Sequence, residues 1–200
     1  MKVPTGEDPK LISRGSLITK STYTAQQGRG KEPAIAWHSA GCLTPGPGPQ
    51  GLFKPMNLIS LQSGSNGNCI YVEAGDVKLF FDAGISGRQA AERLSLAGRD
   101  IAGVNALIIS HDHADHVRCA GIFQRKFGIP LYATEKTMRA ARLRHDLGVL
   151  NEVCHFRAGA SMRFGTVRVD TLPTPHDGAE GVAFIVDDGK SRLGIFTDLG

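Results

Sequence analysis

The chain has 200 residues, 41% of them hydrophobic, which is enough for one domain with an ordinary core. No stretch approaches the roughly 20 apolar residues of a membrane-spanning helix, and the N-terminus MKVPTGEDPKLISRGSLITK lacks the apolar core of a signal peptide. The four cysteines are scattered without a CxxC pair, so we expect reduced thiols. These features exclude a membrane protein and a disulfide scaffold, and they predict a cytoplasmic protein without a membrane partner.

The positive charge lies in the N-terminal part of the chain. Residues 1–55 hold seven Lys and Arg against three Asp and Glu, whereas residues 56–200 hold 16 of each kind. The first segment shows no sustained helix or strand period, and its GCLTPGPGPQG stretch cannot pack a core. We expect residues 1–55 to be a disordered tail, or the product of a misassigned start ahead of Met56. Residues 56–200 are then the folded domain.

Strand-like and helix-like segments alternate from Met56 onward. Apolar runs bounded by turn residues predict strands at 57–62, 69–74, 77–84, 104–110, 129–134, 152–156, 161–173, 181–188 and 192–198. Helical spacing predicts helices at 87–98 (capped by Ser86), 117–128 and 135–148. Gly75-Asp76 and Asp188-Gly189 predict hairpin turns, so the strands are not all parallel. This mixture predicts a layered α/β fold.

The segment SHDHADH, residues 110–116, directly follows the predicted buried strand VNALII. Imidazoles and carboxylates are costly to bury unless they are hydrogen-bonded, paired or bound to a cation. In an extended segment His111 and His113 point to the same side, whereas Asp115 and His116 follow in the turn into the helix. One short segment can therefore serve two neighbouring metal ions. Nitrogen and oxygen ligands without a thiolate favour zinc, manganese or iron in a hydrolytic role.

Two further polar clusters lie at strand ends. TPHDG contains His176, and FTDLG contains Asp198. Each is associated with an apolar strand that could bring it to the sheet edge where SHDHADH lies, because open sheets gather their sites from loops at one end.

These motifs together carry a family resemblance. SHDHADH matches the HxHxDH signature of the metallo-β-lactamase fold, and the order LFFDAG, HDHADH, TPHD, FTDLG resembles that family's successive motifs. SGSNGNCIYVEAGDVKLFFDAG, SHDHADH, TPHDG and GIFTDLG resemble the WalJ/YycJ-type subgroup of bacterial metallohydrolases in particular. The resemblance covers residues 56–200. It implies an αββα sandwich, of the α/β (α+β) class, with metal ions at one edge between two sheets.

The resemblance also implies a role for each matching residue. The first metal ion would be bound by His111, His113 and His176, the second by Asp115 and His116, and both by a bridging Asp198. Asp115 would also act in catalysis by orienting the attacking hydroxide, and Asp82 would support the metal loop from behind. Two divalent ions are implied, zinc first, with manganese or iron as alternatives. Members of the family supply at least one more His beyond this point, so we expect a chain that is incomplete at its C-terminus.

The subgroup implies a phosphodiesterase, a 5′ exonuclease that cleaves DNA by metal-hydroxide attack. Two metal ions can ionise a water molecule and stabilise charge on the scissile oxygen, so no Ser, Cys or Lys nucleophile is required. The alternatives are a hydrolase of small esters, thioesters or lactones, and an inactive, truncated metal-binding remnant. The length argues against an amidohydrolase barrel, which needs about 250 residues and a different downstream ligand order.

Other polar residues have simpler structural explanations. A predicted helix carries four cations that could meet phosphates, although a solvated helix face is the commoner explanation: Lys136, Arg139, Arg142 and Arg144. The SGSNGN loop is more often a turn than a phosphate cradle. His145 and His155 are expected to be structural, Cys119 to face the core, and His38 to lack a partner in the tail.

Overall fold

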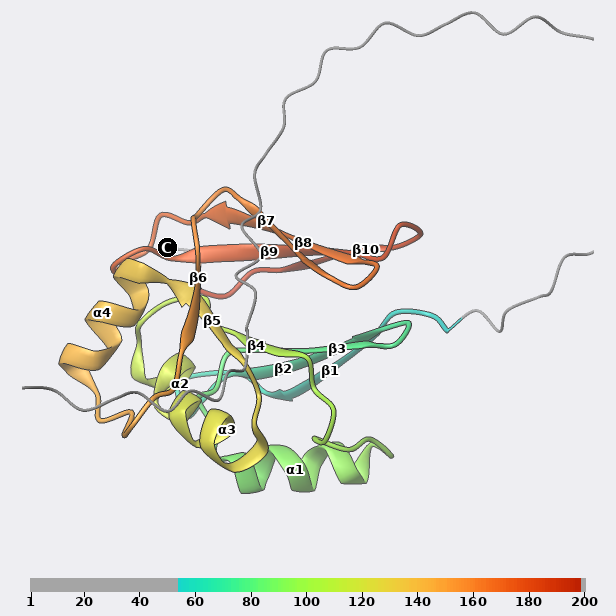
Figure 1. Ribbon diagram of the computed structural model, residues 1–200, viewed down its shortest axis with the longest axis horizontal. Helices are drawn as coiled ribbons and strands as arrows, with labels where there is room; N and C mark the ends of the chain where they lie inside the picture. The colour runs from blue at the N-terminus through green and yellow to red at the C-terminus, as the bar shows by residue number, and fades with distance from the viewer. Residues whose placement is uncertain (1–53, 199–200) are drawn as a thin grey trace, which may run out of the picture. The chain divides into compact units, whose positions relative to one another are not determined.

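A computed structural model of the protein describes residues 54–198. The predictions for His38, Cys42 and the rest of the segment before Lys54 therefore lie outside the described residues. Between Asn57 and Ile195, ten strands form two sheets, one with the order β1-β2-β3-β4-β5-β6 and one with the order β10-β9-β8-β7. Figure 1 shows the two sheets lying one above the other.

The larger sheet combines an antiparallel and a parallel half. β1 (Asn57–Gln62), β2 (Cys69–Ala74) and β3 (Val77–Phe81) form an antiparallel meander, with the expected hairpin turn between β2 and β3. β4 (Ala106–Ile108), β5 (Leu131–Thr134) and β6 (Val153–Phe156) continue the sheet in parallel with β3. The carboxyl ends of these four strands therefore meet at one edge.

Four helices connect the parallel strands. They are α1 (Gly87–Leu96), α2 (Ala114–Val117), α3 (Ala120–Phe127) and α4 (Glu135–Arg144). Ser86 caps α1 as predicted, because its side chain accepts a hydrogen bond from the backbone N–H of Gln89 and the Gln89 side chain accepts one from the Ser86 N–H. Thr134 caps α4 in a similar way through the N–H of Thr137.

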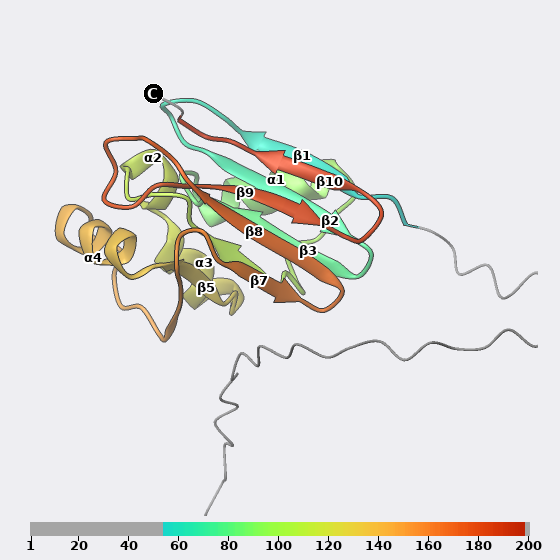
Figure 2. The same ribbon diagram turned by 90° about the horizontal axis from the view of Figure 1, so that it is seen from above.

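The smaller sheet is antiparallel throughout. It contains β7 (Ser161–Phe164), β8 (Val167–Pro173), β9 (Val182–Asp187) and β10 (Arg192–Ile195). Figure 2 shows these strands lying over the larger sheet and running in nearly the same direction as β1, β2 and β3. The expected hairpin turn at Asp188-Gly189 joins β9 to β10.

Two apolar cores hold the layers together. The first lies between the larger sheet and the helices, all four of which contribute to it, with Phe80, Leu107 and Phe123 among its buried side chains. The second lies between the sheets, where the Phe81 and Phe184 rings are 5.0 Å apart. The described residues thus form a helix layer and two sheet layers, which confirms the predicted mixed α/β class and sandwich arrangement. Within residues 54–198, no helix contributes to the core under the smaller sheet.

Three predicted element boundaries were wrong for identifiable reasons. The helix expected at 117–128 is interrupted before Ala120, because the Cys119 N–H donates to the Ala83 carbonyl instead of to a helical partner. The helix expected at 135–148 ends at Arg144, since the following His145 has an extended backbone (φ −135°, ψ 144°). The strand expected at 161–173 is a hairpin, and Gly165 supplies the positive φ of 57° that its turn requires.

Two findings concern membrane-spanning helices and the thiols. Among the helices of residues 54–198, none is long and apolar enough to cross a membrane. Cys69, Cys119 and Cys154 are free thiols, as expected, and Cys119 is half-buried against the first core.

Candidate metal centre

The centre lies where the chain leaves β4 and turns into α2. This position is fixed by the buried strand: the Asp82 N–H donates to the Ile108 carbonyl and the Ile109 N–H to the Tyr132 carbonyl. Residues 110–113 then leave the sheet edge, and His113 is the N-cap residue of α2. The His111 and His116 side chains are 2% and 0% exposed, so both imidazoles are held inside the protein.

The structure brings all six sequence-predicted ligands together in two overlapping groups. One group contains His111, His113, His176 and Asp198, and the other contains Asp115, His116 and Asp198. Within each group, one potential ligand atom per residue lies within 4.8 Å of the others. These residues come from three separate parts of the chain, the β4–α2 segment, the β8–β9 loop and the segment just after β10. Such groups of nitrogen and oxygen donors could hold metal ions.

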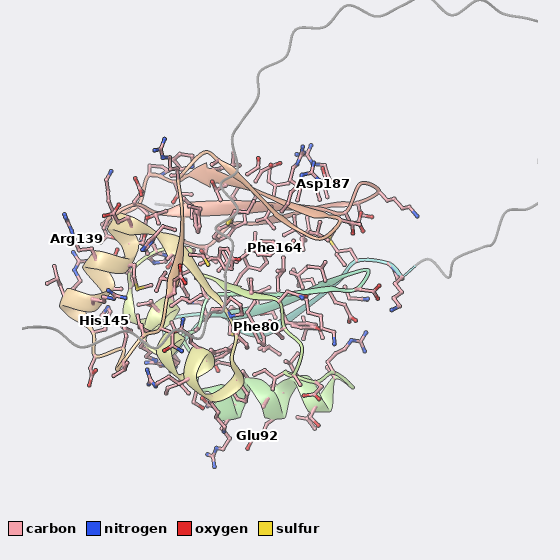
Figure 3. All side chains as sticks on the ribbon, in the orientation of Figure 1. Phe80, Glu92, Arg139, His145, Phe164 and Asp187 are labelled. Carbon is pink, nitrogen blue, oxygen red and sulfur yellow. The ribbon has the colours of Figure 1, made fainter. Side chains whose placement is uncertain are left out.

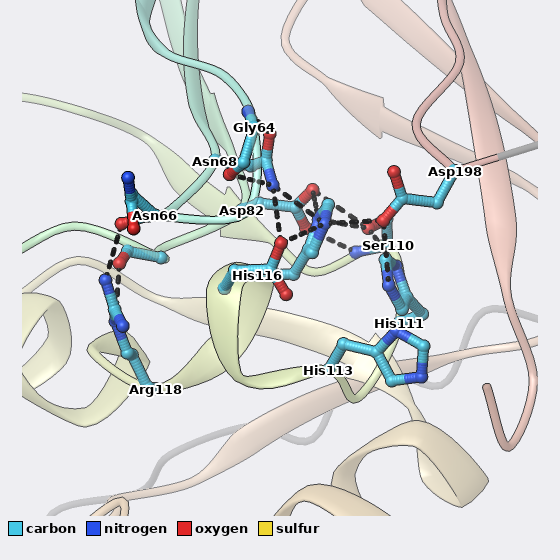
Figure 4. Close-up of polar contacts among 12 residues, drawn as sticks. Gly64, Asn66, Asn68, Asp82, Ser110, His111, His113, His116, Arg118 and Asp198 are labelled. Carbon is cyan, nitrogen blue, oxygen red and sulfur yellow. Dashed lines mark hydrogen bonds and ion pairs between the residues drawn. The ribbon is translucent and has the colours of Figure 1, made fainter.

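Asp198 belongs to both groups and lies between two imidazoles. Its Oδ2 atom is 2.9 Å from His116 Nε2 and 3.5 Å from His111 Nε2. Figure 4 shows the Asp198 carboxylate directed toward these histidines. The residue has a positive φ of 48°, an uncommon backbone conformation for a residue other than glycine. The chain just after β10 is thus bent in a way that directs this carboxylate toward the histidines.

A buried carboxylate fixes the orientation of His116 from behind. Asp82 accepts hydrogen bonds from the Ser110 N–H and hydroxyl, each at 2.8 Å, and its Oδ2 lies 2.8 Å from His116 Nδ1. A carboxylate only accepts, so His116 Nδ1 carries a proton, and in the neutral imidazole the lone pair lies on Nε2. Asp82 has a φ of 64°, another left-handed residue at the site. This is the supporting position that the resemblance implied for Asp82.

His111 is oriented by the same network. The Ser110 hydroxyl already donates to Asp82, so its 2.9 Å contact with His111 Nδ1 has the imidazole N–H as donor. The lone pair of His111 then lies on Nε2, a buried atom without a hydrogen-bond partner among the described residues. Buried polar atoms without a partner are rare in folded proteins. A cation between His111 Nε2 and Asp198 would satisfy this atom, so the donor set fits a divalent metal ion.

Burial and neighbouring charges give the two buried histidines opposite pKa shifts. Burial, together with the neighbouring His116, lowers the pKa of His111 to about 4. Burial also acts to lower the pKa of His116, but the hydrogen bond and charge of Asp82, with Asp115 and Asp198, outweigh it and raise that pKa. His111 is therefore a neutral imidazole at neutral pH, which is the form that binds a metal ion.

Asn68, the last residue of the SGSNGN loop, reaches the centre although the sequence analysis did not select it. Its side-chain amide donates to Asp115 Oδ2 at 3.1 Å and lies 2.9 Å from His116 Nε2. Its backbone N–H donates to the Asp115 carbonyl at 2.6 Å. The loop is thus a turn, as expected, and its Asn68 also contacts Asp115 and His116. In the sequence, Asn68 differs from the other loop residues only in that it directly precedes the strand that begins at Cys69.

The residue between the first two histidines is anchored from α4. Asp112 is fully buried, its carboxylate is paired with Arg144, and the Ala179 N–H donates to it at 2.8 Å. His145 Nε2 lies 2.9 Å from the Asp112 carbonyl oxygen. His145 therefore has the structural role that was expected. Arg144 lies on the exposed face of α4, as expected, but its guanidinium also pairs with the buried Asp112 carboxylate, which the sequence did not predict.

Both the sequence and the fold of this chain are similar to those of known proteins. Residues 63–200 match the model of the Metallo-beta-lactamase superfamily. Exodeoxyribonuclease YycJ of Bacillus anthracis is 33% identical over 142 residues, which cover 70% of this chain and 53% of the relative. Exodeoxyribonuclease WalJ of Streptococcus pneumoniae serotype 2 is 35% identical over 144 residues, with the same coverage. The chain thus spans about half the length of the curated relatives it matches.

Solved structures are similar at the level of the fold. A metallo-β-lactamase with a HARLDQ motif from Cronobacter sakazakii superposes with a TM-score of 0.59 at 16% identity, over 74% of this chain and 61% of the other. The metallo-β-lactamase fold protein YhfI from Bacillus subtilis gives a TM-score of 0.55 at 17% identity, over 70% and 62%. At these identities, the likeness shows a shared fold and says nothing about substrate.

Proposed function

The chain belongs to the metallo-β-lactamase superfamily, and from this we propose that it is a dinuclear metal-dependent hydrolase that cleaves phosphodiester bonds in DNA. One observation carries the metal-dependent part: two ligand groups share Asp198, and one of them contains buried His111, whose Nε2 atom has no hydrogen-bond partner among the described residues. The choice of DNA is supported by two relatives named exodeoxyribonucleases at 33% and 35% identity.

Each ligand has a proposed place. His111, His113 and His176 would hold one ion, Asp115 and His116 would hold the other, and Asp198 would contact both. Divalent ions, with zinc as the first choice, would lower the pKa of a water molecule and stabilise negative charge on the scissile oxygen. Apart from the shared Asp198, the first group contains three potential ligands and the second group contains two. We therefore propose that the first ion is held more tightly.

The protein's own groups would then prepare the reaction. Asp82 and Ser110 keep the lone pairs of His116 and His111 directed toward Asp198. Asp115 is one-quarter exposed, so its carboxylate faces the solvent side of the centre, where it would orient a water molecule for attack. Asn68 restrains this carboxylate through its amide N–H. No serine or cysteine nucleophile is required in this scheme.

The experiment is a cleavage assay on single-stranded DNA carrying a label at either end. We expect the full chain to release 5′ nucleotides in the presence of Zn²⁺ or Mn²⁺, and to lose this activity with EDTA or as the double variant H111A/H113A. Asp76→Asn is the matched control, because Asp76 is 94% exposed in the β2–β3 turn and should keep full activity. Hydrolysis of thioesters or lactones but not DNA would overturn the DNA assignment. If the H111A/H113A variant cleaved DNA as fast as the wild-type chain, the candidate metal centre would not be the site of the reaction.

A further inference from the structure

A groove runs along α4 on the side where this helix faces β6. One part of it, with a volume of about 330 Å³, is lined by Arg139, Arg142, Leu143 and His155, among others. The adjoining part, of about 400 Å³, is lined by Lys136, His155, Phe156 and Arg157. Both parts share Glu135 and His155, so they form one continuous depression, which we call the α4 groove.

The α4 groove is rich in unpaired positive charge. Lys136, Arg139 and Arg142 follow one another at intervals of three residues, which places them on neighbouring positions of the helix surface. Within residues 54–198, the side chains of Arg139, Arg142 and Arg157 are exposed and form no hydrogen bond or ion pair with the protein. Residues 56–200 carry equal numbers of positive and negative side chains, so this clustering is local. An anionic ligand is therefore the complementary partner.

Helix α4 contacts the segments of the candidate metal centre near both of its ends. Near the start of the helix, Lys136 pairs with Glu180 at 3.0 Å and the Thr137 hydroxyl donates to the Glu180 carbonyl, and Glu180 lies in the loop that carries His176. At the end of the helix, Arg144 pairs with Asp112, between His111 and His113. Figure 3 shows Arg139 and His145 beside α4, at the edge of the molecule. A chain molecule bound along α4 therefore passes next to the loops that carry the ligands.

We propose that the α4 groove binds the backbone of a single-stranded polynucleotide whose end reaches the metal centre. This inference rests on the proposed function and identifies where the substrate lies. Cations spaced along a groove can follow successive phosphates, and apolar surfaces beside them can receive bases. Leu143, which is 83% exposed, and the partly exposed Phe156 provide such surfaces within the groove. Lys136 is partly neutralised by Glu180, so Arg139, Arg142 and Arg157 carry most of the attraction.

The test measures, by fluorescence anisotropy, how tightly the full chain binds a single-stranded DNA probe. The probe is a fluorescein-labelled strand of about 12 thymidine nucleotides with phosphorothioate linkages. The double variant R139Q/R142Q removes two phosphate contacts, so the slope of log K against log salt should become shallower by about 1.4. At about 0.1 M salt this corresponds to roughly 25-fold weaker binding. The variant R139K/R142K keeps both charges and should retain most of the affinity.

R163Q/K190Q is the matched control. Both residues are exposed, and they lie near the β7–β8 and β9–β10 turns, at the opposite end of the smaller sheet from His176 and Asp198. Equal affinities of R139Q/R142Q and R163Q/K190Q would overturn the α4 groove as the binding track, even where DNA cleavage by the wild-type chain upholds the proposed function. Weaker binding by R139Q/R142Q alone would support the groove, even where no variant cleaves DNA and the proposed function falls.

Discussion

Asp82 Oδ2 lies 2.8 Å from His116 Nδ1, although 34 positions separate the two residues and neither side chain is more than 2% exposed. The same oxygen accepts the Ser110 hydroxyl, which in turn contacts His111. One carboxylate at the end of β3 thus fixes the rings of two candidate metal ligands on another segment. This contact is possible because β3 and β4 are paired in parallel, so the residues that follow the two strands lie at the same edge of the sheet.

The first prediction concerns this support. Asp82→Asn keeps the shape of the side chain but removes the acceptor-only carboxylate, so His116 should lose its fixed tautomer. We expect metal affinity to fall about 10- to 100-fold, as is usual when an outer hydrogen-bond partner of a ligand is replaced. Competition with a chromophoric chelator measures this change, and Asp76→Asn should leave the affinity unaltered. A folded Asp82→Asn variant with wild-type affinity would show that Asp82 has no positioning role.

The second prediction separates a shared ligand from one that serves a single ion. Asp198 belongs to both ligand groups, whereas Asp115 belongs to only one. After dialysis, the wild-type chain should retain two metal ions per chain, and the Asp115→Ala variant should retain about one. The Asp198→Ala variant should retain fewer metal ions than Asp115→Ala, because it loses a ligand of both ions. Elemental analysis by mass spectrometry gives these numbers directly. Equal retention by the two variants would argue against a shared position for Asp198.

The third prediction concerns the close approach of three backbone segments behind the centre. A Cβ atom at Gly84 would overlap the Asp115 carbonyl oxygen and lie 2.5 Å from the Asn68 nitrogen. Neither neighbour is a flexible side chain, so we expect Gly84→Ala to lower the free energy of unfolding by more than about 3 kcal/mol. Gly103→Ala is the comparison, because that site is open and only its φ of 75° opposes alanine, at a cost of about 1 to 2 kcal/mol. Urea unfolding that gave the same loss for both variants would contradict the proposed crowding.

The fourth prediction tests the core between the sheets. Phe184 is 1% exposed and its ring lies 5.0 Å from that of Phe81. Phe184→Ala should therefore lower the free energy of unfolding by about 3 to 5 kcal/mol. Phe196, which is 52% exposed, provides the control, and its replacement by alanine should change stability by no more than about 0.5 kcal/mol. Similar losses for both phenylalanines in urea titrations would mean that the smaller sheet does not pack as described.

Local sequence patterns were sufficient to predict most of the fold. Turn residues at Gly75-Asp76 and Asp188-Gly189 mark two hairpins, and alternation or short apolar runs mark the strands between them. The boundaries that failed depend on contacts from elsewhere in the chain. Cys119 interrupts a helix because its N–H donates to Ala83, and His145 ends another while its ring contacts Asp112. Helical spacing alone contains no information about either partner.

Some residues of the candidate centre could be predicted from the sequence, and others could not. The six ligands could be selected because imidazoles and carboxylates at strand ends are unusual and their order resembles a known family. Asn68 could not be selected, since an asparagine in a Gly-rich loop is ordinary turn chemistry until the fold places it 2.9 Å from His116. Arg144 was likewise indistinguishable from its exposed helix neighbours Arg139 and Arg142, because only tertiary structure places Asp112 beside it.

The most direct test of the metal centre is anomalous X-ray diffraction from crystals of the zinc-loaded full chain. The account predicts two anomalous peaks at the zinc edge, one of them about 2.0 to 2.1 Å from His111 Nε2, with the Asp198 carboxylate contacting both. Zinc-loaded crystals without a peak within bonding distance of His111 Nε2 would contradict it.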